Sequence, residues 1–386
     1  MEREEAKRRV AEEVERRADL LLDVSHRIHA RPELLFEERF AAGLLASALG
    51  VEVGAYGLDT AFEARSGSSG PTVAVLCEYD ALPGIGHGCG HNVIAAAGLG
   101  AGLAAASVAE EAGGTLVVLG TPAEEGGGGK VLMGERGAFE GVDAALMVHP
   151  AGADLTEPDV IAIATWKVEY FGRGAHAAAA PHHGRNALDA MVLGYNAVAA
   201  LRQHIASTDR IHGVFLKAGE KPNIVPDYAV AEWYVRSATI DTLQPLKDRV
   251  LACLSGGAAA AGCRMEVTPT CPEYCDLHTN PALIDLYRAN SAALGRPVAD
   301  PSAAARVVAS TDMGNVSHLV PSIHPMIAVS PPGVPLHSAE FAEWAGSDQG
   351  DKAVLDGAKA MAMTVADLWL GEGALEEVRA AFASGP

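Results

Sequence analysis

Residues of the types that bind metals recur where apolar runs end in the first half of the sequence, and one more lies near the C-terminus. Cys89 and His91 stand two residues apart in the string CEYDALPGIGHGCGHN, just before a helix-like run. His149 ends the apolar run DAALMVHPA, and His337 lies in the proline-rich string PGVPLHSAEF. Thiolate and imidazole are preferred ligands of zinc and related divalent metals. Each residue alone also fits an ordinary buried position, so the prediction of a metal site rests on the set.

Two adjacent carboxylates, Glu124 and Glu125, follow the apolar run TLVVLG in the string GTPAEEGGGG. Adjacent side chains on an extended segment point in opposite directions, so one carboxylate can bind a metal while the other faces a water molecule beside the substrate. The alternative is a solvated acidic turn. The position directly after an apolar strand favours the metal site.

Two strings in the sequence resemble motifs for phosphate or dinucleotide binding, but neither string matches its motif. The string GGGGK resembles a phosphate-binding loop, but Glu124 stands where its first glycine belongs, and no Ser or Thr follows Lys130. Gly98 and Gly100 lie within a helix-like run, with Leu103 where a dinucleotide fingerprint has its third glycine. There is also no GxSxG nucleophile motif.

The elements that must hold these residues alternate between strand and helix over the first 160 residues. TVAVLCEYD, TLVVLG and DAALMVHP are predicted strands, and the small apolar residues 93–109 predict a buried helix between the first two. This alternation indicates an α/β fold, with a mixed sheet flanked by helices. Ligands in such folds gather outside the carboxyl ends of the strands, which is where the polar residues stand.

From about Thr165 the order changes to strand, helix, strand, strand, helix and strand. This β-α-β-β-α-β order is typical of a ferredoxin-like α+β unit and indicates an inserted domain. We therefore predict a catalytic domain made of residues 1–164 and 271–386, interrupted by a second domain at residues 165–270.

The amino-acid composition indicates which classes of binding partner and which cellular setting to expect. The 386 residues are 49% apolar and 20% charged, which predicts a folded globular protein. The formal charge of -20 would repel nucleic acid and anionic lipid, so neither is an expected partner. Six cysteines are too few for a disulfide scaffold, and the charged N-terminal segment does not resemble a secretory signal, so we expect a cytoplasmic protein.

Read in order, a series of strings resembles the M20 metallopeptidase family over essentially the whole chain. The strings are HARPELLFEE, EYDALPGIGHGCGHN, GTPAEEGGGG, MVHPA, FGRGAHAAAAPHHGRNALDA, NIVPD, STDMGNVSHLVPSIHP and PLHSAEF. The match is to the amidohydrolase branch that includes peptidase M20 domain-containing protein 2 and aminobenzoyl-glutamate hydrolase type enzymes.

The resemblance implies a set of ligands for two divalent metal ions, zinc or manganese. These ligands are Cys89, His91, Glu125, His149 and His337. Glu124 is then the general base, since a carboxylate beside a water activated by metal can take its proton and pass it to the leaving amine. The resemblance also implies that the inserted domain is a lid that dimerises, so a homodimer is expected.

Within the lid, the resemblance assigns three further residues. His176, in GRGAHAAAAP, would stabilise the oxyanion, and Asn223 of NIVPD and Arg236 of WYVRSAT would contact the substrate carboxylate. A guanidinium suits a carboxylate, yet an arginine at a strand end is as often an ordinary surface residue, and both interpretations stay open for Arg236.

The sequence departs from the classical M20 pattern at the end of the first predicted parallel strand. Classical members have His-x-Asp there, whereas this chain has Glu78, Tyr79 and Asp80. The resemblance then implies that Cys89 bridges the metals and that Asp80 orients a histidine ligand from behind. Whether Glu78 contacts a metal is left open.

The expected function is hydrolysis of an amide or peptide bond in a small substrate that carries a carboxylate: a dipeptide, an N-acyl amino acid or an aminobenzoyl-glutamate-like amide. One alternative is a catalytically silent metal-binding or interaction protein on the same fold. Another is an α/β protein without a metal. The presence of Glu124 favours the enzyme, because a silent relative is free to lose the base.

Overall fold

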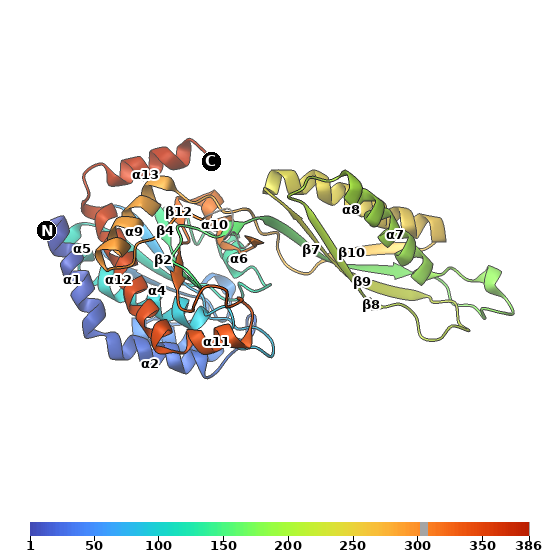
Figure 1. Cartoon of the computed structure of the whole chain (residues 1–386), viewed down its shortest axis with the longest axis horizontal. Coiled ribbons are helices and arrows are strands. Elements are labelled where there is room, and N and C mark those ends of the chain that lie inside the picture. Colours follow the sequence, from blue (N-terminus) through green and yellow to red (C-terminus); the bar gives the residue numbers. More distant parts are fainter. Residues whose placement is uncertain (302–307, 386) are drawn as a thin grey trace. The chain divides into compact units, whose positions relative to one another are not determined.

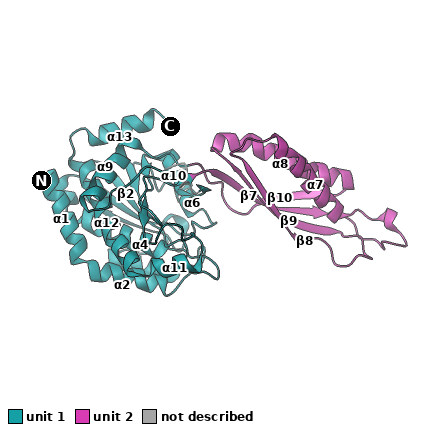
Figure 2. Cartoon of the chain, viewed as in Figure 1, with its two compact units in different colours: residues 1–159, 277–386 teal, residues 160–276 magenta. Residues whose placement is uncertain are grey.

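The chain forms two compact units in the computed structural model, which describes residues 1–301 and 308–385. The first unit comprises Met1–Asp159 and Leu277–Pro386, and the second is the insertion Val160–Asp276 (Figure 2). Each unit has its own apolar core. A chain of this length therefore folds around more than one core, as its size predicts.

A five-stranded sheet forms the centre of the first unit. In the order of the sheet its strands are β1 (Phe62–Ser66), β3 (Thr115–Gly120), β2 (Thr72–Cys77), β4 (Ala144–Leu146) and β12 (Ser322–Ile323). All neighbours are parallel except the antiparallel pair β1 and β3. The chain passes from β2 to β3 on one side and returns to β4 on the other. The carboxyl end of β2 is therefore a topological switch point, where open sheets bind ligands.

Helices cover both faces of this sheet (Figure 1). Val73, Val75 and Cys77 of β2 face the core formed with the helices α1 (Arg3–Arg16), α2 (Ala18–His29), α4 (His91–Ala106) and α12 (Asp348–Leu370). Ala74 and Leu76 face the opposite core, formed with α6 (Gly129–Glu135) and α10 (Met313–Leu319). Alternate residues of one strand thus enter two cores, which explains its unbroken apolar sequence.

Small residues let helix α4 pack closely against the sheet on one side and against helix α12 on another. A Cβ atom at Gly98 would lie 2.6 Å from the carbonyl oxygen of Leu76, and one at Gly100 would lie 2.9 Å from Cβ of Ala358. These glycines therefore serve packing. The helix predicted at 93–109 begins two residues earlier than expected, and a separate short helix, α5 (Ala109–Ala112), follows it.

The other helices and strands of the first unit surround this core. The helices are α3 (Arg39–Leu49), α9 (Pro281–Ala293), α11 (Ala339–Ala345) and α13 (Ala374–Ala383). The strands are β5 (His149–Ala151), its parallel partner β13 (Met326–Ala328) and the short β11 (Val308–Ala309). The two-residue strand β6 (Asp159–Val160) stands where the chain leaves the first unit.

The second unit has the predicted β-α-β-β-α-β order. Its elements are β7 (Ala162–Phe171), α7 (Ala187–Leu201), β8 (Arg210–Lys217), β9 (Tyr228–Ser237), α8 (Ile240–Ala261) and β10 (Arg264–Pro269). They form an antiparallel sheet in the order β10-β7-β9-β8, whose core includes residues of both helices. The prediction of an α/β catalytic domain with an inserted ferredoxin-like domain is confirmed. Among the described helices, none is both long and apolar enough to cross a membrane.

Candidate metal site

Buried polar residues follow three neighbouring strands of the first unit at the same edge of the sheet. Glu78 and Asp80 come after β2, Glu124 after β3, and His149 after β4. The parallel strands β3, β2 and β4 bring their carboxyl ends together. Residues far apart in the sequence therefore meet around the carboxyl end of β2.

His91 is the first residue of α4 and is completely buried. Its Nδ1 atom lies 3.0 Å from Oδ1 of Asp80, which leaves Nε2 to face the site, where it has no hydrogen-bond partner among the described residues. A left-handed glycine, Gly90 (φ 77°), turns the chain into the helix, and a Cβ at this position would lie 2.8 Å from the ring of Pro150. A histidine held through one nitrogen, with the other directed at an inner space, has the arrangement of a metal ligand.

Cys89 and the glutamate pair surround the same space. Sγ of Cys89 lies 3.4 Å from Nε2 of His149. Nε2 of His91 lies 3.9 Å from Oε2 of Glu124 and 3.8 Å from Oε1 of Glu125, and the other oxygen of Glu125 lies 3.6 Å from Nε2 of His337. The two oxygens of Glu125 thus face two different histidines.

Three overlapping groups of side chains offer ligand atoms within 4.8 Å of one another. The groups are Cys89, His91 and His149; Cys89, Glu125 and His337; and His91, Glu124 and Glu125. Together they contain all five ligands that the resemblance implies, and Cys89 belongs to two of them. Thiolate and imidazole suit zinc, and carboxylate suits manganese, so this set of side chains could hold divalent metal ions.

Burial makes this cluster of acidic groups costly without a compensating cation. Burial raises the pKa of the Cys89 thiol well above its usual value, and the Glu125 carboxylate adds to the effect. Burial, and then the charge of Glu78, raises the pKa of Glu124. Burial also lowers the pKa of His149 to about 4, so this ring is neutral and can donate a lone pair to a metal. A divalent cation would relieve the repulsion among the acidic groups.

Sequence reasoning missed a buried ionic cluster behind the site. Lys130 is completely buried, with its Nζ atom 2.5 Å from Oε1 of Glu78 and 2.7 Å from Oδ1 of Asp312. The second oxygen of Glu78 lies 3.6 Å from Nε2 of His91. The available signal was Lys130 itself, which follows a glycine run that does not match a phosphate-binding loop. This lysine lies in the first turn of helix α6.

His324 is a second residue that sequence reasoning missed. It is 2% exposed, and its ring stacks on that of His149 with 5.2 Å between centroids. Burial lowers its pKa well below the usual value, so a neutral imidazole lies against His149. The signal was a histidine ending the string VPSIHP, close to the short strands β12 and β13.

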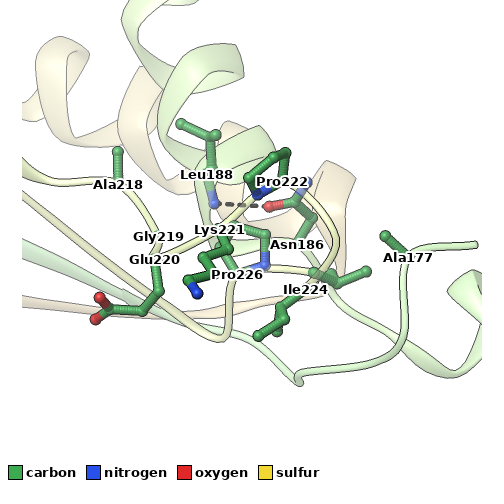
Figure 3. Close-up of a pocket in the computed structure, with 11 residues that line it drawn as sticks. Ala177, Asn186, Leu188, Ala218, Gly219, Glu220, Lys221, Pro222, Ile224 and Pro226 are labelled. Carbon is green, nitrogen blue, oxygen red and sulfur yellow. Dashed lines mark hydrogen bonds between the residues drawn. The ribbon is translucent and has the colours of Figure 1, made fainter.

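In the second unit, the structure brings His176 and Asn223 together. His176 is exposed, and its Nδ1 accepts hydrogen bonds from the backbone of Ala178 and Ala179. The N–H of Ala177 donates to the carbonyl oxygen of Asn223 at 3.0 Å. Beside them lies a cavity of about 390 Å³ whose lining includes Ala177 and Ile224 (Figure 3).

Arg236 lies at the other end of the same sheet. Phe171 pairs with Tyr228 near His176 and Asn223, whereas Arg236 pairs with Ile163 at the start of β7. Tyr228 and Arg236 are eight positions apart along β9, which corresponds to roughly 26 Å at about 3.3 Å per residue. Within the second unit of one chain, Arg236 and Asn223 are therefore too far apart to contact the same small carboxylate.

The sequence model of peptidase family M20/M25/M40 matches residues 74–367 of this chain. The protein belongs to this family. Xaa-Arg dipeptidase of Mus musculus is 39% identical over 396 aligned residues, covering 97% of this chain and 92% of the mouse protein. One of the subunits of p-aminobenzoyl-glutamate hydrolase from Escherichia coli (strain K12) is 30% identical, covering 92% of this chain and 90% of its own.

Solved M20 structures share the fold. An aminobenzoyl-glutamate utilization protein from Klebsiella pneumoniae has a TM-score of 0.75 at 20% identity, covering 93% of this chain and 98% of its own. A Bacillus subtilis M20 peptidase described as dinuclear metal binding has a TM-score of 0.68 at 18% identity, covering 91% and 98%. The family assignment predicted from the motifs is confirmed, and the chain is an M20-type hydrolase of amide bonds.

Proposed function

We propose that this protein is a dinuclear metallo-dipeptidase that cleaves the peptide bond of a small substrate carrying a carboxylate. The convergence of the three ligand groups around Cys89 and His91 carries this proposal. Cys89, His91, Glu125, His149 and His337 would hold the two ions, zinc or manganese. When bound, the ions would polarise the scissile carbonyl and make a water molecule more acidic.

The two glutamates have separate roles in this proposal. Glu125 directs one oxygen at His91 and the other at His337, so its carboxylate would help these histidines to hold the ions. Glu124 is 7% exposed and lies beside His91. It is the base in this proposal: its carboxylate takes a proton from the attacking water and passes it to the leaving amine. Asp80 keeps His91 oriented, and the exposed His176 donates a hydrogen bond to the oxyanion.

A pocket in the first unit adjoins the proposed ligands and supports a choice of substrate. Its volume is about 620 Å³, and its lining includes Ala151, Met326 and Leu336. Ala151 lies two residues after His149 on β5, hence on the same side of the strand, and Leu336 precedes His337. An apolar pocket beside the ligands suits the side chain of a bound dipeptide.

Two acidic residues, Glu157 and Asp159, also line this pocket. Apolar walls suit the methylene stem of a lysine or arginine side chain, and carboxylates suit its cationic end. The Xaa-Arg dipeptidase relatives point to the same class of substrate. We therefore propose a dipeptide with a basic residue as the substrate, in preference to an N-acyl amino acid or an aminobenzoyl-glutamate-like amide. A cytoplasmic setting, based on the low cysteine content, is part of the proposal.

A substrate panel tests this proposal. Protein loaded with Mn²⁺ or Zn²⁺ is assayed against Xaa-Arg, Xaa-Lys and Xaa-Leu dipeptides, an N-acetyl amino acid and aminobenzoyl-glutamate. We expect the highest kcat/KM for the basic dipeptides. In a Glu157→Gln variant, the ratio of kcat/KM for these dipeptides to kcat/KM for Xaa-Leu should be smaller than in the wild type. A preference for aminobenzoyl-glutamate would overturn the choice of substrate, and inactivity on the whole panel would contradict the proposed function.

The proposal includes a homodimer formed through the second unit. His176 and Asn223 lie at one end of the sheet and Arg236 at the other, so one site that uses all three needs residues from two chains. Strand β8 is an edge strand with two residues that are 58% exposed, Val214 and Leu216. An exposed apolar edge favours pairing with another strand, and a second copy of this chain supplies an identical one.

A further inference from the structure

A buried carboxylate outside the ligand set holds the backbone just before the two glutamates. Glu38, at the start of α3, is 0% exposed. Its Oε1 atom accepts hydrogen bonds from the N–H groups of Phe36 and Ala123, each at 2.9 Å. Its Oε2 accepts from the hydroxyl of Thr60, also at 2.9 Å. The side chain thus links the N-terminal segment to the turn after β3.

Both backbone groups that share Oε1 belong to residues in the left-handed region. Phe36 has φ 59° and Ala123 has φ 58°, a conformation that disfavours residues with a Cβ. The two side chains also crowd Gly127, where an added Cβ would lie 2.5 Å from both Cβ of Ala123 and the ring of Phe36. Strain of this kind persists only where surrounding contacts hold it, and Glu38 supplies two of those contacts.

A second carboxylate holds the other side of the turn. The N–H of Glu125 donates to Oδ2 of Asp80 at 3.0 Å. Glu124 therefore lies between two anchored peptide groups, the N–H of Ala123 and the N–H of Glu125, and the side chain of Glu125 follows the second of them directly. Rotation of the backbone at Ala123 would move both carboxylates, because they follow it directly in the chain.

We propose that Glu38 is a positioning residue for Glu124 and Glu125: it holds the left-handed turn at Ala123 that directs one carboxylate to the substrate and the other to the metals. The inference rests on the proposed function for the roles of these glutamates. Glu38 itself touches neither of them and acts through the backbone of Ala123. A misplacement of about 1 Å in a catalytic group can lower the rate by roughly 100-fold, so a backbone clamp matters for turnover.

The test compares Glu38→Ala and Glu38→Gln, each alone and combined with Ala123→Gly. Glutamine keeps an oxygen that can accept from Phe36 and Ala123, so Glu38→Gln should stay within about 5-fold of wild-type kcat, whereas Glu38→Ala should lose about 30- to 100-fold with KM changed less than about 3-fold. Glycine adopts a positive φ without strain, so Ala123→Gly should restore about 10-fold of the loss in Glu38→Ala.

Glu33 provides the matched control. Its carboxylate accepts from the N–H groups of Phe40 and Ala41 at 2.8 and 3.0 Å, and so it caps the same helix. Glu33→Ala should lower Tm and leave kcat unchanged. If Glu38→Ala does not fold, Glu38→Asp replaces it, because it keeps the buried charge but withdraws the carboxylate from Ala123.

Titration of each apoprotein with MnCl₂ by calorimetry gives a readout that does not depend on a substrate. We expect weaker binding in Glu38→Ala, because Glu125 moves with the turn, and recovery with Ala123→Gly. Equal losses in Glu38→Ala and Glu38→Gln would overturn the inference. It would also be overturned if Ala123→Gly restored neither kcat nor metal affinity in Glu38→Ala. An inactive wild type that still shows this pattern of metal binding would contradict the proposed function and leave the role of Glu38 standing.

Discussion

Oδ1 of Asp80 lies 3.0 Å from Nδ1 of His91, and both side chains are buried. This contact holds the imidazole with Nε2 directed into the site. Because Oδ2 of the same carboxylate accepts from the N–H of Glu125, Asp80 connects α4 to the turn after β3. Removal of Asp80 should therefore disturb two proposed ligands at once.

We predict that Asp80→Ala weakens metal binding by about 10- to 100-fold, the usual effect of losing a residue that orients a ligand. Calorimetric titration with Zn²⁺ or Mn²⁺ measures this. Asp143→Ala is the control, because Asp143 accepts from the N–H of Thr72 at the opposite end of β2 and should affect stability alone. Equal metal affinities in Asp80→Ala and the wild type would show that His91 needs no such support.

Glu124→Gln should lower kcat by roughly 100-fold with metal content unchanged, because the amide keeps the shape of the side chain but cannot take a proton. Glu125→Gln should instead lose metal. Metal analysis of dialysed protein and steady-state kinetics separate the two effects. Loss of metal in Glu124→Gln with retention in Glu125→Gln would mean that the two roles are reversed.

A chelator should abolish activity, and added Zn²⁺ or Mn²⁺ should restore it, with up to two ions bound per chain. Cys89→Ser should lower the metal content, since Cys89 belongs to two of the ligand groups. The matched change Cys253→Ser affects a half-buried thiol on α8 of the second unit and should leave the metal content as in wild type. Less than one ion per chain after repletion would contradict the dinuclear site.

Lys130→Met should destabilise the apoprotein by about 3–5 kcal/mol, because it leaves the buried charges of Glu78 and Asp312 without their partner. Urea unfolding measures the change. Lys352→Met is the control, since Lys352 is 60% exposed and pairs with Asp356 one turn away on α12, and such pairs contribute about 1 kcal/mol or less. A similar loss from both variants would argue against a special role for the buried cluster.

Light scattering at micromolar concentration should give twice the chain mass of 39.8 kDa. Replacement of Val214 and Leu216 by lysine should shift the protein to the monomer, because charged side chains block strand pairing at an edge. The matched double change Leu34→Lys and Leu35→Lys places the same charges on exposed residues of the first unit and should leave the mass unchanged. A mass near that of one chain for the wild type would contradict the dimer.

Local patterns in the sequence were sufficient to predict the fold class, the inserted domain and the types of residue at the site. Periodicity and short apolar runs reflect which face of an element is buried, so strands such as β2 and β3 can be recognised from their own residues. Cys89, His91, Glu124 and Glu125 carry chemistry in their residue types and stand next to recognisable elements. The family motifs then supplied the assignment that spacing alone left open.

Contacts between distant segments were decided by the tertiary structure. Lys130, Asp312 and Glu38 carry charge, and composition alone places charged residues on the surface; they are buried here because partners from other parts of the chain satisfy them. Arg236 and Asn223 appear equivalent in the sequence, yet the antiparallel register of β7 and β9 places them at opposite ends of one sheet. Strand pairing and burial depend on residues far apart in the chain, which local propensity does not encode.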